Sequence, residues 1–317
     1  MGIQYLNKFL KTECHQSIYN RGLKQLSGKK IVVDIGIYMF KFAADDSLKE
    51  NMYLMFSVFK YYNIIPIFVF DGKPPTEKKE LIEERREAKK KAELKYEILK
   101  TKLNDCDNIV EINEIENSMD SLKKQFVYLL KSDFIFVKEL INAFGYTYID
   151  APEEADIICA YLTIKGIVWG CLSEDMDMFI YGCPIIIRYF SLLNHSCVIY
   201  NLSGILNELR LTQYELKQIG ILSGTDYNRN EKKINLHIIL KYFKKYKKKK
   251  ISMDFYDWLI VNTDFIDNID LLNKINDMFN VSNKEELKIY DKQKIISGCH
   301  DKEKISNLLK DDGFIFL

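Results

Sequence analysis

Seven acidic side chains stand beside the ends of apolar segments, and they are the residues of this chain best suited to chemistry. They are Asp34, Asp71, Glu154, Asp156, Asp175, Asp177 and Asp226. Acids at the carboxyl ends of parallel strands point into the crevice where open α/β sheets bind ligands. Several acids in one crevice repel one another unless cations neutralise them, and Mg²⁺ or Mn²⁺ are the hard ions that favour oxygen ligands. The acids therefore predict a divalent metal site.

The elements that must position these acids alternate between strand and helix. Strands are expected at 30–34, 64–70 and 146–149, and a strand–helix–strand unit around 167–190. The remaining elements expected are helices at 37–62, 76–102 and 118–144, a turn at 71–75, a less regular piece at 103–117 and a helix opening at 152–154. This alternation favours an α/β fold with a mostly parallel central sheet flanked by helices.

The helix expected from residue 76 to about residue 102 is rich in Glu, Lys and Arg and lacks a proper apolar stripe. A helix that is polar nearly all round either bridges through solvent or contacts a polar partner. One interpretation is a protruding hairpin held by pairs of opposite charge. The other is a basic arch over the acidic crevice, which we favour because the helix follows Asp71 so closely.

Composition excludes several classes of protein. The chain has 317 residues, 47% of them hydrophobic, enough for a substantial core in one large or two intimate domains. Its apolar stretches are too short to cross a bilayer, and its first residues have no signal-peptide design. Seven cysteines without a Cys-x-x-Cys pair, together with four histidines, argue against a zinc site and suit a reducing compartment. We expect a soluble, intracellular protein.

A net charge of +1 hides a strongly basic segment. Residues 229–250 contain ten Lys or Arg and one acid, Glu231. Such a block is typical of a surface that contacts phosphates. A solvated lysine-rich tail or a nuclear-import signal is the alternative, and the metal-type acids elsewhere favour nucleic acid.

Six short blocks resemble those of flap endonucleases, the structure-specific 5′ nucleases of the XPG group, and they occur in the same order. They are Met1-Gly2-Ile3, Val33-Asp34, Phe68-Val69-Phe70-Asp71-Gly72-Lys73-Pro74-Pro75, Asp150-Ala151-Pro152-Glu153-Glu154-Ala155-Asp156, Ser173-Glu174-Asp175-Met176-Asp177 and Gly224-Thr225-Asp226-Tyr227. The resemblance covers about residues 1–245. It implies a fold like that of PIN domains and 5′ nucleases, with a helical arch. It also implies an N-terminal nuclease region at 1–105, an internal nuclease region at 106–227 and a C-terminal helical region at 228–317, whose degenerate helix–two-turn–helix-like part is the expected DNA-binding region.

The resemblance implies roles for individual residues. The seven acids match the family's metal-site acids, which hold two Mg²⁺ or Mn²⁺ ions, although position 156 usually holds Glu. Lys78 and Arg85 match the catalytic basic pair of the arch, and being seven residues apart they share one helix face. Lys79 and Arg86 could take over from them. Glu174 lies between ligands but is expected to point the other way.

The resemblance also implies substrate-binding residues. Phe40 matches the ring that stacks on a base near the scissile bond, with Tyr38 as the neighbouring alternative, and Gly2 is expected beneath the active site. After Asp226 the family has a Gly-x-Gly turn that binds duplex phosphate and helps hold K⁺. Here Lys233 and Asn235 replace the two glycines. We therefore expect this segment, including Lys232, to bind duplex DNA mainly through charge.

The function implied is cleavage of 5′ flaps in branched DNA, with endonuclease and 5′-exonuclease action in replication, repair or recombination. Two alternatives remain open: an RNA endonuclease with the same chemistry, and a catalytically weak junction-binding protein. We expect a monomer that acts in the nucleus or at a cytoplasmic site of DNA replication. No sliding-clamp motif is present in the sequence, and residues 314–316 could form a small terminal strand.

Overall fold

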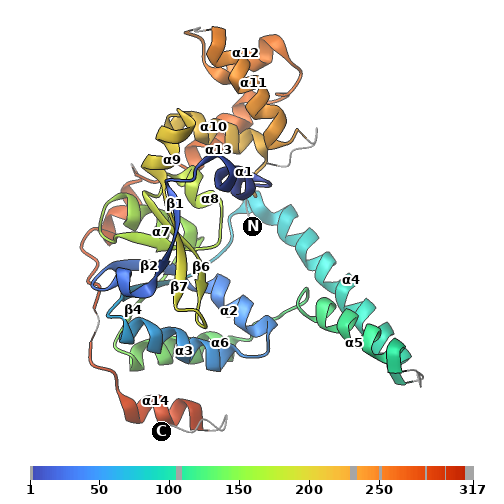
Figure 1. Ribbon diagram of the computed structural model, residues 1–317, viewed down its shortest axis with the longest axis vertical. Coiled ribbons are helices and arrows are strands. Elements are labelled where there is room, and N and C mark those ends of the chain that lie inside the picture. Colours follow the sequence, from blue (N-terminus) through green and yellow to red (C-terminus); the bar gives the residue numbers. More distant parts are fainter. Residues whose placement is uncertain are drawn as a thin grey trace.

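The computed structural model describes residues 3–104, 109–228, 234–249, 252–282, 284–296 and 298–310. Over these residues it has one mixed sheet in the order β1-β7-β6-β5-β2-β3-β4 (Figure 1). The strands are β1 (Ile18–Gly22), β2 (Lys30–Asp34), β3 (Ile65–Phe70), β4 (Thr147–Asp150), β5 (Gly170–Leu172), β6 (Ile185–Ser191) and β7 (Ser196–Asn201). The expected strands are thereby confirmed.

The centre of the sheet is parallel and one edge is antiparallel. β2 pairs in parallel with β3 and β5, β3 with β4, and β5 with β6. β7 pairs antiparallel with β6 and with the edge strand β1. The expectation of a mostly parallel sheet is confirmed, whereas β1 and β7 were not foreseen.

Alternating side chains of the central strands separate two cores, one on each face of the sheet. In β2, Val32 joins one core, while Ile31 and Val33 join the other. In β3, Ile67 faces the first core and Phe68 the second. Strands that are buried on both faces consist of continuous apolar residues, and for this reason β2 and β3 could be predicted from the sequence.

Helices cover both faces of the sheet (Figure 1). The second core is closed by α2 (Ile35–Ala44), α3 (Leu48–Tyr61), α6 (Lys131–Ala143) and α14 (Lys302–Leu309). The first core is closed by α1 (Leu6–Glu13), α7 (Ala155–Ile164), α8 (Asp177–Tyr181), α9 (Leu202–Leu209), α10 (Gln213–Ser223), α11 (Leu236–Lys249), α12 (Phe255–Asn262) and α13 (Ile269–Met278). Short 3₁₀ turns lie at η1 (Leu23–Leu26), η2 (Thr76–Lys78) and η3 (Glu285–Tyr290).

Two helix boundaries differ from expectation. The stretch expected as one helix at 37–62 is two helices, α2 and α3. The single helix expected at 118–144 is also wrong: α5 (Ile109–Lys123) begins inside the piece expected to be irregular, and α6 starts at Lys131. The break before α6 has a local cause, because the Asp133 carboxylate accepts the Leu130 N–H at 2.7 Å and fixes the new N-terminus. The strand suggested at 314–316 lies outside the described residues.

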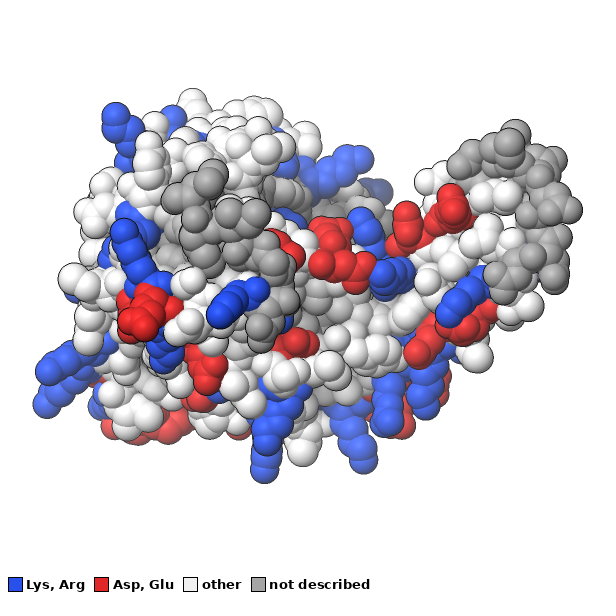
Figure 2. Space-filling view, turned by 90° about the horizontal axis from the view of Figure 1, so that it is seen from below, with Lys and Arg blue, Asp and Glu red and all other residues white. Residues whose placement is uncertain are grey.

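A helical hairpin projects from the body of the molecule. α4 (Lys79–Asn104) packs against α5 and leads away from the sheet (Figure 1). Figure 2, which views the molecule from below, shows cationic and anionic side chains interspersed over the body and the hairpin. Of the described helices, none combines the length and apolar character that crossing a membrane requires.

Candidate active site

The first two acids meet at the carboxyl ends of neighbouring parallel strands. Asp34 ends β2 and Asp71 follows β3. A β-carbon placed on Gly36 would lie 3.1 Å from Asp71 Oδ2 and 3.6 Å from Asp34 Oδ1. Both carboxylates therefore border the same small space, and a glycine at position 36 keeps it open. The Ala155 N–H, at the start of α7, donates to Asp71 Oδ1 at 2.8 Å.

A loop after β5 adds two further acids. Ser173 Oγ donates to Asp34 Oδ2 at 3.4 Å and accepts the Asp175 N–H at 3.2 Å. Asp175 Oδ1 in turn accepts the Asp177 N–H at 2.9 Å, which directs the start of α8. The serine hydroxyl thus joins this loop to β2. Asp34, Asp175 and Asp177 are all buried.

Mutual repulsion shows that the acids share one electrostatic environment. Burial, then the charges of Asp71 and Asp175, raises the pKa of Asp34 to about 8. The pKa values of Asp156 and Asp177 are also raised, first by burial and then by Asp175. These acids come from four separate chain segments, so the fold gathers them as the sequence predicted.

Two cations from the base of the hairpin neutralise the remaining acids. Lys78 Nζ lies 2.6 Å from Glu154 Oε1 and 3.8 Å from Asp226 Oδ2. Arg85 Nη2 donates to the same Asp226 oxygen at 2.8 Å. Burial lowers the pKa of Lys78, but Glu154, Asp226 and Asp156 outweigh it and raise the pKa above its usual value. Lys78, at the end of η2, and Arg85, on α4, therefore both reach Asp226.

The donor set fits a hard divalent ion. Among the groups that the structure describes, the buried Oδ1 atoms of Asp156 and Asp177 have no hydrogen-bond partner. Carboxylate oxygens in surplus are the ligands that Mg²⁺ and Mn²⁺ favour. Within the described part of the chain, no three or more His, Cys, Asp or Glu side chains are arranged to hold a metal ion. Glu154 and Asp226 pair instead with Lys78 and Arg85.

Known proteins match both the sequence and the fold. The model of the XPG N-terminal domain matches residues 1–92, and that of the XPG I-region matches residues 145–226. Flap endonuclease 1 of Saccharolobus solfataricus is 30% identical over 73% of this chain and 71% of its own length. The chain belongs to the flap endonuclease/XPG family. The resemblance seen in the sequence is thereby confirmed.

Two further comparisons agree with this assignment. Flap endonuclease 1 of Enterocytozoon bieneusi is 28% identical over 78% of this chain and 71% of its own length. A solved structure of the catalytic core of Rad2 with a DNA substrate has a TM-score of 0.68 and 20% identity, covering 98% of this chain and 95% of that one. At that identity the structural match supports the fold, an α/β core like that of the family's 5′ nucleases.

The family's aromatic position is exposed in this chain. Phe40, on α2, is 45% exposed, and Lys89 Nζ of α4 lies 5.2 Å from its ring centroid. Tyr38, the neighbouring alternative, is fully buried in the second core. The ring free to meet a base is therefore Phe40, and its role in binding stays a prediction.

Other expected positions have mixed outcomes. Glu174 points away from the acids: its carboxylate accepts the Tyr189 N–H and pairs with Arg188 Nε at 3.4 Å. Asn235 is exposed before α11, and its side chain accepts the Ile238 N–H at 3.1 Å. Its part in duplex binding is untested. The remaining positions of the substrate-binding prediction fall outside the described residues: Gly2, Lys232 and Lys233.

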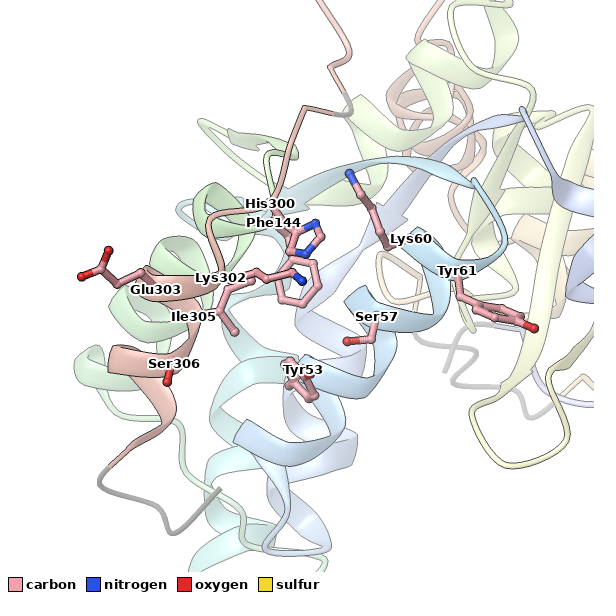
Figure 3. A pocket seen from close by; sticks show the side chains of 10 residues that line it. All are labelled: Tyr53, Ser57, Lys60, Tyr61, Phe144, His300, Lys302, Glu303, Ile305 and Ser306. Carbon is pink, nitrogen blue, oxygen red and sulfur yellow. The ribbon is translucent and has the colours of Figure 1, made fainter. Parts of the chain in front are cut away.

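One residue of the site was not foreseen from sequence. The Tyr227 hydroxyl donates to Glu154 Oε2, and its ring lies 4.5 Å below Lys78 Nζ. The only sequence signal was its place next to Asp226 in a matching block. By contrast, a cavity of about 680 Å³ between α3 and α14 is lined by none of the seven acids (Figure 3).

Proposed function

We propose that this chain is a structure-specific 5′ nuclease that cuts flaps near the junction of single- and double-stranded DNA with the help of two Mg²⁺ or Mn²⁺ ions. Membership of the flap endonuclease/XPG family makes it a hydrolase of phosphodiester bonds. The observation that carries the proposal is the convergence of strand-end acids with Lys78 and Arg85 at the base of the hairpin. It acts as a monomer in replication, repair or recombination, in the nucleus or at a cytoplasmic site of DNA replication.

The metal ions would be held by the seven acids. Divalent ions held there would supply Lewis-acid chemistry: polarisation of the phosphodiester, a source of hydroxide near neutral pH and stabilisation of the leaving oxygen. Asp34 and Asp71 would provide ligands because they border the same space beside Gly36, and Asp175 would provide another because Ser173 connects its backbone to Asp34. The substitution of Asp for the family's usual Glu at position 156 is compatible with this role, since Oδ1 of Asp156 is buried and has no partner among the described groups.

Lys78 and Arg85 have a second task once the acids hold metal. Released from Glu154 and Asp226, their cationic groups can turn to the scissile phosphate, which gains negative charge in the transition state. Fixed cations aimed at developing charge act strongly in a site that excludes water. Lys78 is almost fully buried, so its ammonium lies where water is largely excluded.

A basic groove next to α11 suits the duplex part of the substrate. A cavity of about 620 Å³ between α1 and α11 is lined by Lys8, Lys241, Lys244, Lys245 and Lys248, among others. Cations spaced along a groove bind phosphates without reading base sequence. This arrangement agrees with an enzyme that selects DNA by its shape.

The test compares cleavage of three nucleic-acid substrates. 5′-Labelled flap DNA, gapped duplex DNA and single-stranded RNA are incubated with the chain and Mg²⁺, with Asp175→Asn as the inactive control. The proposal expects the flap to be cut near its junction, faster than the other two. Faster cleavage of RNA would support the RNA endonuclease instead. Tight flap binding without cleavage would indicate a junction-binding protein and refute the proposal.

A further inference from the structure

The C-terminal region places an aromatic side chain beneath the acids. α13 packs against α10, and Phe279, directly after α13, is 1% exposed. Its ring lies 4.7 Å from that of Tyr181 at 62° and 5.6 Å from that of Tyr227 at 86°. Both are edge-on contacts, which the charge distribution of aromatic rings favours. A residue far along the chain therefore supports two tyrosines at the site.

Tyr227 contacts both members of the closest ion pair in the site. Its hydroxyl donates to Glu154 Oε2, while Lys78 Nζ binds Glu154 Oε1 and lies over the Tyr227 ring. The carboxylate of Glu154 is thus held at one oxygen by a phenol and at the other by an ammonium. Rotation of Tyr227 would remove its hydrogen bond to Glu154 and its ring contact with Lys78.

The same C-terminal segment also holds the base of the hairpin. Lys274 Nζ of α13 lies 3.3 Å from Glu77 Oε1, and Glu77 directly precedes Lys78. Asn280 Oδ1 accepts a hydrogen bond from Lys217 Nζ of α10 at 2.5 Å. Residues 269–280 therefore contact Tyr227 through Phe279, and they contact η2, at the base of the hairpin, through Lys274.

We propose that Tyr227 is a positioning residue that orients Glu154 and Lys78, and that Phe279 braces its ring. This inference rests on the proposed nuclease function. It gives residues 269–280, to which the sequence assigned no role, a part in catalysis that requires no contact with DNA. A brace of this kind affects the chemical step more than binding, because the groups it orients act on the reacting phosphate.

The experiment compares Phe279→Leu and Tyr227→Phe with a matched control, Phe144→Leu. Phe144 is 3% exposed and makes edge-on contacts in the other core, so its loss removes a similar aromatic side chain away from the site. Single-turnover cleavage and flap binding are measured for each variant, together with the thermal midpoint. In the metal-free protein, labelling of Lys78 by an amine-reactive reagent is followed by mass spectrometry.

Both site variants are expected to cut the flap at least about tenfold more slowly. Tyr227→Phe loses the hydrogen bond to the Glu154 carboxylate, and Phe279→Leu loses the ring contact that aligns Tyr227. Flap affinity should stay within about twofold, since no substrate contact changes. A variant that carries both Tyr227→Phe and Phe279→Leu should cut the flap no more slowly than the slower of the two single variants, because both changes disturb the orientation of the same Glu154–Lys78 pair. Labelling of Lys78 should increase in Phe279→Leu and not in Phe144→Leu.

Equal cleavage rates and equal Lys78 labelling in Phe279→Leu and Phe144→Leu would overturn the brace. An unchanged rate in Tyr227→Phe, which keeps the ring and should fold normally, would overturn the positioning role. Lack of flap cleavage by the wild-type chain would contradict the proposed function instead, and the Lys78 labelling would still decide whether Phe279 braces the pair.

Discussion

Replacing Asp34 by Asn should stabilise the metal-free protein while abolishing cleavage. The pKa of Asp34 is raised from 3.8 to about 8 by burial and by Asp71 and Asp175. A raised carboxyl pKa means that the folded state holds a proton that the unfolded state releases. The free energy of unfolding therefore falls as the pH rises from the pKa of Asp34 in the unfolded state towards its pKa in the folded state.

The magnitude follows from the size of the shift. About four pKa units, at 1.36 kcal/mol each, correspond to about 6 kcal/mol once Asp34 is ionised in both states. Between about pH 5 and about pH 8 the wild-type protein should lose about 4 kcal/mol through this one group. Asn keeps the shape of Asp and can still accept from Ser173, so Asp34→Asn should remove most of this loss.

The assay is urea unfolding in EDTA at the two pH values. Asp120→Asn, an exposed position on α5, serves as the control and should behave as the wild type. Added Mg²⁺ should narrow the difference between the two proteins, because ligand at a hundred times its Kd stabilises the metal-binding wild type by about 2.7 kcal/mol. If Asp34→Asn were no more stable than the wild type at the higher pH, the claim that these acids repel one another would be refuted.

Three further outcomes test other parts of the account. Lys78→Ala and Arg85→Ala should each lower the single-turnover rate about a hundredfold with flap Kd little changed, because their charge serves the transition state; a change in Kd alone would contradict this. Phe40→Ala should weaken flap binding about tenfold, as expected for one lost base stack, and unaltered binding would exclude stacking there. Replacing Lys244 and Lys248 by Gln should reduce the slope of log Kd against log salt by about 2, and an unchanged slope would place the duplex elsewhere.

The sequence predicted the parallel centre of the fold because its physical signals are local. β2 and β3 are continuous apolar runs that each lead directly to an acid, and Asp34 and Asp71 lie where such strand ends should place them. β1 was missed because its residues are half-buried or exposed, as befits an edge strand, and they give no apolar run. The division between α5 and α6 was missed although Asp133, three residues after Leu130, was a readable capping signal.

The candidate site was predicted as a set of residues but not as a set of contacts. Family blocks identified the acids, Lys78 and Arg85 one by one. Their pairing joins Lys78 to Glu154 and Arg85 to Asp226, across gaps of 76 and 141 residues. Contacts at such separation depend on the whole fold, and no local pattern encodes them. For the same reason, no local pattern indicated that the rings of Phe279 and Tyr227 would be in contact.

The most direct test is a titration of the metal-free protein with Mn²⁺ in the presence of flap DNA, followed by electron paramagnetic resonance of the free ion. The account predicts two Mn²⁺ ions bound per chain in the wild type and fewer than two in Asp175→Asn, with loss of cleavage in that variant. Saturation by Mn²⁺ that is equal in both proteins, or no saturable binding in either, would contradict the assignment of these acids as the metal site.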